Sequence, residues 1–241
     1  FCGLYSNGPD IHRVTYGMVD ALLEDLIGAG NARYMAARNS VIVQYNEIAL
    51  SRWVDKTISG AGIRVLTGAV VREVTTADRR IKTLEATSRF GDVVIEAEGF
   101  VDASGDAAVV WLAGLPVKEP VDPIYGTQVV LIEDFDEGAA ASIDRWEMQD
   151  HLARKADEYG LIRKDGFVFT FPGHGIALAN MTHIPTPLDP IGYSDTVFEG
   201  RDQADRLMAF LKTEYADAYG SARIRAYPAP GIRQTRWIAG C

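Results

Sequence analysis

Apolar residues in the first quarter of the chain recur at helical spacing. The stretch 14–30 places them at intervals of three and four and then ends in glycine, which predicts a helix. The stretch 46–62 repeats this pattern, and Asn46 lies where it can cap the helix. The apolar stripe of this second helix consists of Leu50, Trp53, Val54 and Ile58. Between the two, the short β-branched stretch 39–45 predicts a strand.

The next part of the chain reads mainly as strands. Residues 63–74 predict a strand pair or one bent strand, and residues 80–104 predict further strands that turn at 90–92. The region 40–115 therefore runs as strand, helix, strand, antiparallel strands and strand. This order predicts an α/β layer that carries a small antiparallel piece.

The pattern changes after a proline-rich stretch that contains Pro116, Pro120 and Pro123. Strands and helices then alternate without a parallel repeat, which predicts an α+β unit. The expected elements are a strand at 126–135, a helix from Trp146 to Tyr159, a hairpin at 166–181 and a helix from Arg201 to Tyr219.

Composition and charge exclude several classes of protein. The 241 residues carry a formal net charge of −9, so we expect no nucleic-acid partner and no anionic membrane surface. No apolar run approaches the roughly 18 residues of a membrane span. Cys2 and Cys241 provide neither a disulfide framework nor metal-ligand spacing, and the four histidines are not at metal-ligand spacing either. We therefore expect a cytoplasmic protein without a metal site.

The two ends of the sequence differ from ordinary termini. The chain opens on Phe1 without an initiator methionine and closes at Cys241 without a polar tail. These features predict an internal piece of a longer protein or one product of processing.

The stretch Val101 to Asp106, with the sequence VDASGD, has two interpretations. Small residues at the end of a strand let backbone N–H groups approach a ligand, and ligands of open α/β sheets bind at the carboxyl ends of strands. Alternatively, the stretch is an ordinary turn in which Asp106 caps a following helix.

Three separated motifs resemble the FAD-dependent oxidoreductases of the glutathione-reductase-type fold, in the group related to fumarate reductase flavoproteins. They are Asp102–Ala107 (DASGDA), Asn180–His183 (NMTH) and Gly231–Gly240 (GIRQTRWIAG). Their order, together with the earlier GIRVLTGAVV at 62–71, is similar to that of the family.

The resemblance implies FAD as cofactor and a small organic substrate that exchanges hydride with the flavin. The implied fold class is α/β, an incomplete three-layer FAD-binding domain with an inserted α+β cap. Residues 1–117 and 231–241 would form the FAD-binding part and residues 118–230 the substrate or cap domain. The expected cofactor-binding residues are Val70, Val71, Ala103, Ser104, Gly105 and Asp106.

The same resemblance points to two residues for the chemistry. Arg233, in the segment that returns to the flavin site, would clamp a carboxylate or stabilise a reduced anionic ring. The alternative for Arg233 and Arg236 is pairing with surface acids. His183 would present a proton donor to the substrate. His174, in a hairpin tip, is expected to be exposed and structural.

Departures from the family leave other hypotheses open. No strand–GxGxxG–helix unit is present, because the glycines at Gly28 and Gly30 follow a helix. We therefore expect that these 241 residues alone do not hold FAD tightly and are inactive. The rivals are a non-catalytic binding or assembly module and one chain of a split flavoenzyme. A partner chain or a homo-oligomer also stays open, and a nicotinamide-dependent dehydrogenase is disfavoured.

Overall fold

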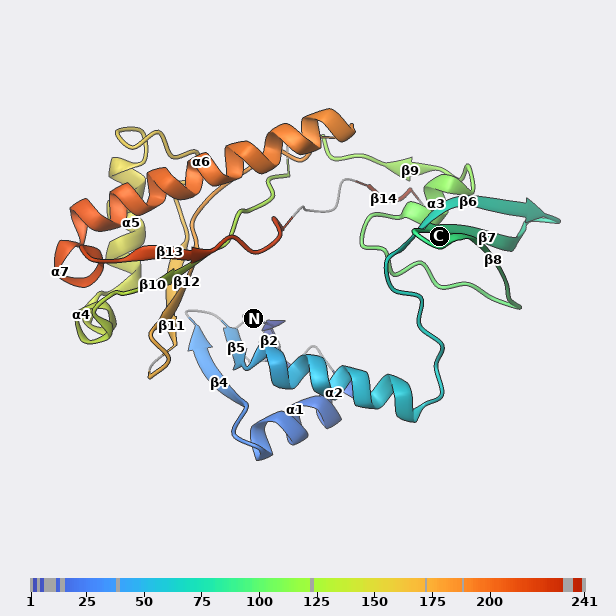
Figure 1. Ribbon diagram of the computed structural model, residues 1–241, viewed down its shortest axis with the longest axis horizontal. Coiled ribbons are helices and arrows are strands. Elements are labelled where there is room, and N and C mark those ends of the chain that lie inside the picture. Colours follow the sequence, from blue (N-terminus) through green and yellow to red (C-terminus); the bar gives the residue numbers. More distant parts are fainter. Residues whose placement is uncertain are drawn as a thin grey trace. The chain divides into compact units, whose positions relative to one another are not determined.

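The computed structural model describes residues 2–3, 5–6, 12–13, 16–37, 40–121, 124–171, 173–187, 189–231 and 236–239 (Figure 1). The chain forms two compact units, Phe1–Ala69 and Val70–Cys241. Both mix helices with small sheets, so the architecture is α/β as predicted, in several small sheets. The predicted three-layer domain, its inserted cap and the three-part division of the chain stay predictions.

The first unit contains a three-stranded sheet and two helices. Strands β1 (Cys2–Gly3), β5 (Ser40–Tyr45) and β4 (Ala32–Ala37) form this sheet, and β2 (Tyr5–Ser6) pairs with β3 (His12–Arg13). Leu23 of helix α1 (Met18–Gly28) and Val43 of β5 are buried together. The apolar spacing of the sequence therefore places one face of α1 against the sheet.

Helix α2 (Glu47–Gly60) begins where the sequence predicts. The side chain of Asn46 accepts hydrogen bonds from the backbone N–H groups of Ile48 and Ala49, each at 3.0 Å. This cap satisfies donors that have no partner within the helix. The indole of Trp53 donates to Asp25 Oδ2 at 2.7 Å and links α2 to α1.

The second unit begins with a three-stranded antiparallel meander. It consists of β6 (Ala69–Ala77), β7 (Arg80–Ser88) and β8 (Gly91–Glu96), in that order. The short helix α3 (Ala108–Leu112) follows. Strand β9 (Val117–Lys118) then pairs with β14 (Trp237–Ile238) from the far end of the chain.

The strands predicted at 63–74 and 80–104 form only in part, because β6 begins at Ala69 and β8 ends at Glu96. In the described chain, residues 63–67 and 99–103 belong to no strand. A strand requires a neighbouring backbone to bond to, and apolar alternation alone does not supply one. Large apolar side chains in these segments are exposed, at 58% for Ile63, 55% for Leu66 and 92% for Val101.

The largest core lies between a four-stranded sheet and the helices that cover one of its faces. The sheet order is β11 (Phe167–Phe171), β12 (Ile176–Asn180), β10 (Val130–Glu133) and β13 (Arg223–Ala226). Helices α5 (Arg145–Lys155) and α6 (Pro190–Glu214) lie over it, with α4 (Glu137–Ser142) and α7 (Ala216–Tyr219) at one end (Figure 1). Fully buried residues in this core include Val130, Ile132, Leu152, Ala177, Ala179, Leu207 and Phe210.

Helix α6 starts eleven residues before the expected position. Pro190 occupies its first turn, and the Asp189 side chain accepts from the N–H groups of Ile191 and Gly192. Proline at the first helical position after an aspartate cap is a strong start signal, because the missing proline N–H has no partner there in any case. Helix α5, in contrast, ends at Lys155 rather than at Tyr159.

Candidate functional site

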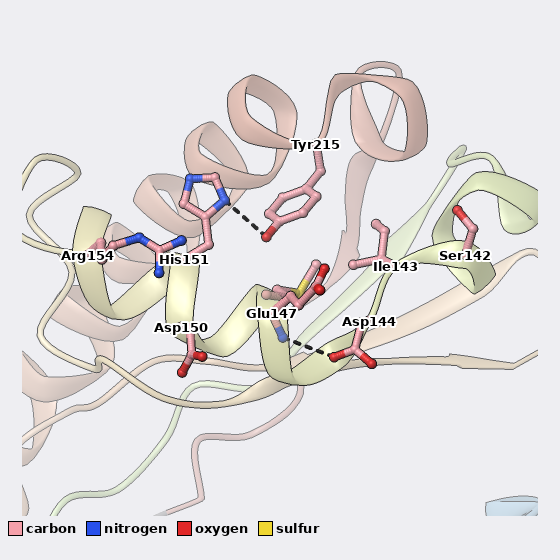
Figure 2. A pocket seen from close by; sticks show the side chains of 9 residues that line it. Ser142, Ile143, Asp144, Glu147, Asp150, His151, Arg154 and Tyr215 are labelled. Carbon is pink, nitrogen blue, oxygen red and sulfur yellow. Dashed lines mark hydrogen bonds between the residues drawn. The ribbon is translucent and has the colours of Figure 1, made fainter.

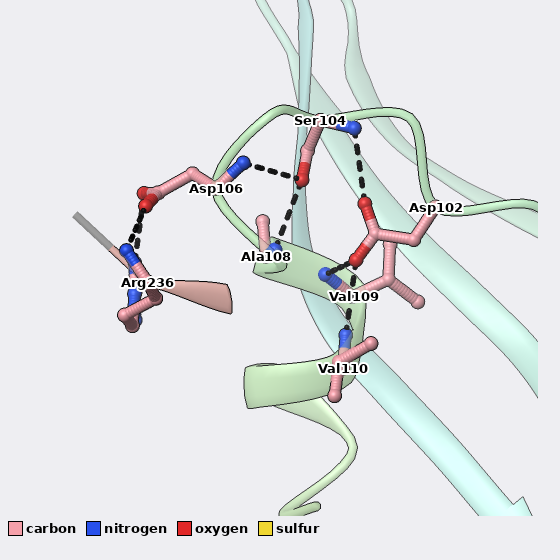
Figure 3. Close-up of polar contacts among 7 residues, drawn as sticks. All are labelled: Asp102, Ser104, Asp106, Ala108, Val109, Val110 and Arg236. Atoms are coloured by element: carbon pink, nitrogen blue, oxygen red, sulfur yellow. Dashed lines mark hydrogen bonds and ion pairs between the residues drawn. The ribbon is translucent and has the colours of Figure 1, made fainter. Parts of the chain in front are cut away.

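The Asp102 side chain holds the loop at the VDASGD motif by accepting hydrogen bonds from backbone N–H groups. Its Oδ1 accepts from the N–H of Ser104 at 3.0 Å, and its Oδ2 accepts from the N–H groups of Val109 and Val110 at 3.0 and 3.2 Å (Figure 3). Burial by itself would raise the pKa of Asp102, but the hydrogen bonds from Ser104, Val110 and Val109 outweigh it and lower that pKa. The carboxylate therefore caps α3 in its ionised form.

The Ser104 hydroxyl completes this internal network. Its Oγ accepts from the N–H groups of Asp106 at 3.4 Å and Ala108 at 3.0 Å. Asp102 and Ser104 thus cap α3, and the expectation that Asp106 would cap it is wrong. The reason is that the loop curls back, so that side chains upstream of the turn reach the first N–H groups of the helix.

The outer face of the loop is open. Ala103, Ser104 and Gly105 are exposed, and no atom lies within 4 Å of the position where a Cβ on Gly105 would stand. Gly105 has φ 76° and Ala107 has φ 49°, both in the left-handed region. In the described part of the chain, the N–H groups of Ala103, Gly105 and Ala107 have no hydrogen-bond partner. A ligand can therefore approach this backbone closely.

Asp106 joins the loop to the far end of the chain. Its Oδ1 accepts from the Arg236 N–H at 3.0 Å, and its Oδ2 pairs with the Arg236 guanidinium at 3.1 Å (Figure 3). The guanidinium carbon of Arg236 also lies 4.2 Å from the ring centroid of Trp111 in α3. The sequence left the partner of Arg236 open, and no spacing in it indicates a contact across 130 residues.

The two valines predicted near the cofactor lie on β6, in the meander that precedes the loop. Val70 is exposed and Val71 is half-buried, as the alternation of a strand requires. Neither side chain belongs to the loop itself. The structure thus groups Ala103 to Asp106 and places Val70 and Val71 on a neighbouring strand.

His183 lies at a second candidate site, where the segments that contain Gly126, Ile184 and Gly231 meet. Gly126 and Ile184 exchange both backbone hydrogen bonds, at 2.9 and 3.1 Å. Thr127 and Gly231 do the same, at 3.0 and 2.8 Å. The imidazole of His183 stacks on the ring of Tyr125, with centroids 4.8 Å apart and an interplanar angle of 3°.

The NMTH motif has a clear structural basis around this meeting point. Asn180 Oδ1 accepts from Arg163 at 2.7 Å and from the Thr127 hydroxyl at 3.3 Å. Met181 and Thr182 are fully buried, whereas His183 is half-buried. The hydrogen bonds of Asn180 and the burial of Met181 and Thr182 thus fix the path of the chain, and His183 lies beside Tyr125. The sequence did not indicate Tyr125 as a neighbour of His183.

Arg233 lies outside the described residues. Gly231, two positions earlier, starts the return segment at the bridge with Thr127.

His174 is exposed, as expected, and its hairpin tip is held by Glu137, whose carboxylate accepts hydrogen bonds from the N–H groups of Gly173 and Gly175 at 2.9 and 2.6 Å. Hydrogen bonds from these two N–H groups lower the pKa of Glu137.

A separate cavity of about 470 Å³ opens beside α5 (Figure 2). On its wall, His151 Nδ1 lies 3.2 Å from the Tyr215 hydroxyl, and His151 Nε2 lies 2.9 Å from Glu214. Burial raises the pKa of Tyr215, so this phenol stays protonated at neutral pH. The lining residues are Ser142, Ile143, Asp144, Glu147, Met148, Asp150, His151, Arg154 and Tyr215.

Metal sites and membrane-spanning helices are both absent from the residues that the structure describes. Among them, no group of three or more His, Cys, Asp or Glu side chains is arranged to hold a metal ion. None of the helices in this part of the chain combines the length and apolar character needed to cross a bilayer.

Comparisons with known proteins place the chain in a family. Of the solved structures, p-nitrophenol 4-monooxygenase PnpA from Pseudomonas putida DLL-E4 matches with 11% sequence identity and a TM-score of 0.43, over 83% of this chain. The match covers 45% of that enzyme, so the chain spans less than half of its length. A search of curated proteins finds no match. The model of the FAD dependent oxidoreductase family matches residues 1–241, and the chain therefore belongs to this family, whose cofactor is FAD.

Proposed function

We propose that the protein is an oxidoreductase that transfers hydride between a small organic substrate and FAD. The observation that supports this best is the loop at 102–107. Its interior N–H groups are bound by Asp102 and Ser104, while those of Ala103, Gly105 and Ala107 have no partner in the described part of the chain. A loop held by internal hydrogen bonds, with small exposed residues at 103–105, fits the phosphate and ribitol portion of a dinucleotide.

The residues of this chain would bind and orient the cofactor. Ala103, Ser104 and Gly105 would contact it through the backbone, and Val70 or Val71 would lie near its adenine. When bound, FAD supplies the redox step, as acceptor or donor of the hydride. In this proposal the FAD-binding part comprises residues 1–117 and 231–241, and residues 118–230 form the substrate domain.

Arg233 and His183 would act on the substrate. The bridges that join Gly126 to Ile184 and Thr127 to Gly231 bring the start of the return segment to the segment that carries His183. Arg233 would hold a substrate carboxylate by charge-assisted hydrogen bonds. His183, oriented by its stack on Tyr125, would donate or accept the proton that accompanies hydride transfer.

The rival function, a non-catalytic binding module, also has an observation in its favour. Five N–H groups at the loop, those of residues 104, 106, 108, 109 and 110, are already bound by Asp102 and Ser104. A loop that only needs to cap a helix would look the same in this respect. The two functions can be distinguished because the oxidoreductase requires bound flavin, whereas the binding module does not.

The decisive measurement is the absorption spectrum of the protein at its natural length, before and after denaturation. Flavin bands that are released on denaturation are expected. Gly105→Val should lower the flavin content, because it places a side chain on the open face of the loop and strains a left-handed residue. Gly99→Val is the matched control, since Gly99 has open space and no positive φ. A colourless protein that gains no bands with added FAD would rule out the oxidoreductase and favour the binding module.

Benzoate is a suitable probe for Arg233 and His183 because it is a small planar carboxylate. It should perturb the flavin spectrum, and Arg233→Gln should weaken its binding by about tenfold or more. His183→Gln should remove a pH dependence of this binding near neutral pH, whereas the exposed His174→Gln should not. Unchanged benzoate affinity in Arg233→Gln would remove Arg233 from the site.

A further inference from the structure

The ion pair between Asp106 and Arg236 joins the loop at 102–107 to the C-terminal part of the second unit. Both carboxylate oxygens of Asp106 are used, one by the backbone N–H and one by the guanidinium of Arg236. The side chains of Arg236 and Asp106 are 16% and 37% exposed, so this ion pair is partly shielded from water. Its guanidinium packs on Trp111 of α3 as well.

Few other contacts in the described chain fix the return segment at this point. Strand β14 pairs with β9 through Trp237–Lys118 and Ile238–Val117, and Ala239 donates its N–H to the Pro116 carbonyl at 3.1 Å. A pair of two-residue strands is marginal by itself. The contacts of Arg236 with Asp106 and Trp111 therefore contribute much of what fixes the return segment to the loop.

The same contacts restrain the loop. Asp102 and Ser104 accept hydrogen bonds from its backbone, and Arg236 binds Asp106, the last polar side chain before α3 begins. Gly105, with its open face and φ of 76°, lies between Ser104 and Asp106. The backbone on either side of Gly105 is thus fixed by hydrogen bonds that do not use its outer face.

We propose that Arg236 is a positioning residue for the cofactor, which holds Asp106 and thereby the backbone of residues 103–107 in the shape that binds FAD. Asp106 then acts as the acceptor for Arg236 and not as a direct ligand of the cofactor. This inference rests on the proposed function. It adds a residue that contacts the loop from the return segment, and it makes FAD affinity depend on a contact outside the loop.

The test is a double-mutant cycle on FAD affinity, with Asp106→Asn, Arg236→Gln and the double variant. FAD dissociation constants are measured by flavin fluorescence on apoprotein of natural length, with thermal unfolding of each apoprotein recorded alongside. Each single variant should weaken FAD binding on the order of tenfold, and the double variant should be no weaker than the worse single one. Arg236→Lys, which retains the charge, should recover part of the affinity.

Arg223→Gln is the matched control. Arg223 also pairs with carboxylates, those of Glu133 and Asp134, but its side chain is 66% exposed and lies on β13. The FAD affinity of the Arg223→Gln variant should equal that of the unaltered protein.

Three results would overturn the inference. In the first, Arg236→Gln lowers the unfolding temperature but leaves the FAD dissociation constant unchanged, which makes the residue structural only. In the second, the effects of Asp106→Asn and Arg236→Gln on FAD binding add independently. In the third, the unaltered protein binds no FAD, which would overturn the proposed function itself and is seen before any variant is made.

Discussion

Gly126 illustrates, at the scale of single residues, how the absence of a side chain holds three segments together. A Cβ at this position would lie 2.8 Å from the Gly231 carbonyl oxygen and 3.1 Å from Ile184 Cγ1. Both distances are shorter than packed atoms tolerate. The bridges beside His183 therefore require glycine here.

Gly126→Ala should destabilise the protein by about 1–3 kcal/mol, because the added methyl group must push the Gly231 backbone or Ile184 away. Urea unfolding followed by circular dichroism measures this free energy. Gly99→Ala is the control, since nothing lies within 4 Å of its added Cβ. Equal stability of the two variants would mean that the meeting point of the three segments adapts without cost.

The sequence predicted some of these residues and not others, for physical reasons. The small residues of VDASGD indicate an accessible backbone, because that property depends on residue type alone. The partners Arg236 and Tyr125 depend on contacts between distant parts of the chain, which no local pattern encodes. For the same reason, one of the two interpretations of VDASGD named Asp106 as the cap of the following helix, whereas Asp102 and Ser104 cap α3.

At the scale of elements, the contact between α5 and the end of α6 depends on ionised Glu214. The Tyr159 hydroxyl donates to Glu214 Oε1 at 2.8 Å, and this hydrogen bond is the main cause that lowers the pKa of Glu214. Burial opposes the shift, while Lys155 and His151 add to it. Because the pKa is lower in the folded state than in the unfolded state, the contact stabilises the fold when Glu214 is ionised.

We therefore expect the unfolding temperature to decrease as the pH falls below about 4.3, the ordinary pKa of glutamate, and through the lower pKa of the folded state. In Glu214→Gln this acid-induced decrease should be smaller, as thermal unfolding between about pH 3 and pH 7 would record. Glu158→Gln is the control, because Glu158 is exposed and also pairs with Lys155. The same pH dependence in all three proteins would contradict the role of Glu214.

Elements were predictable where their start and end signals are local. Asn46 and the apolar stripe define α2, and the β-branched run defines β5. The start of α6 was missed because Gly192 and Ser194 interrupt its first turns and Ile191 and Phe198 are exposed there, although Asp189 and Pro190 signal it. Residues 63–67 and 99–103 show the opposite error, since their strand-like sequences have no strand beside them in the described chain.

At the scale of the whole molecule, the two compact units have separate cores. Damage to one core should therefore leave local stability in the other unchanged. Phe210, fully buried in the larger core, is the suitable residue to change. Phe210→Ala should cost about 3–5 kcal/mol.

Native-state hydrogen exchange tests this separation. In Phe210→Ala, the amides of α5, β10 and β12 should exchange faster, and those of α1 and α2 should exchange as before. Phe90→Ala is the control, because Phe90 is 90% exposed in the turn between β7 and β8 and should change stability by less than about 0.5 kcal/mol. Faster exchange in both units of Phe210→Ala would show that they unfold together.

The segments 63–67 and 99–103 also affect how readily the purified chain aggregates in solution. In the described chain their backbone belongs to no sheet, and Ile63, Val65, Leu66 and Val101 are exposed, a combination that favours association between copies of a protein. Aggregation of the isolated chain would thus begin at these segments, away from the buried core of the four-stranded sheet. A lysine in place of Val101, which is 92% exposed, would act as a gatekeeper against it without disturbing any packed side chain.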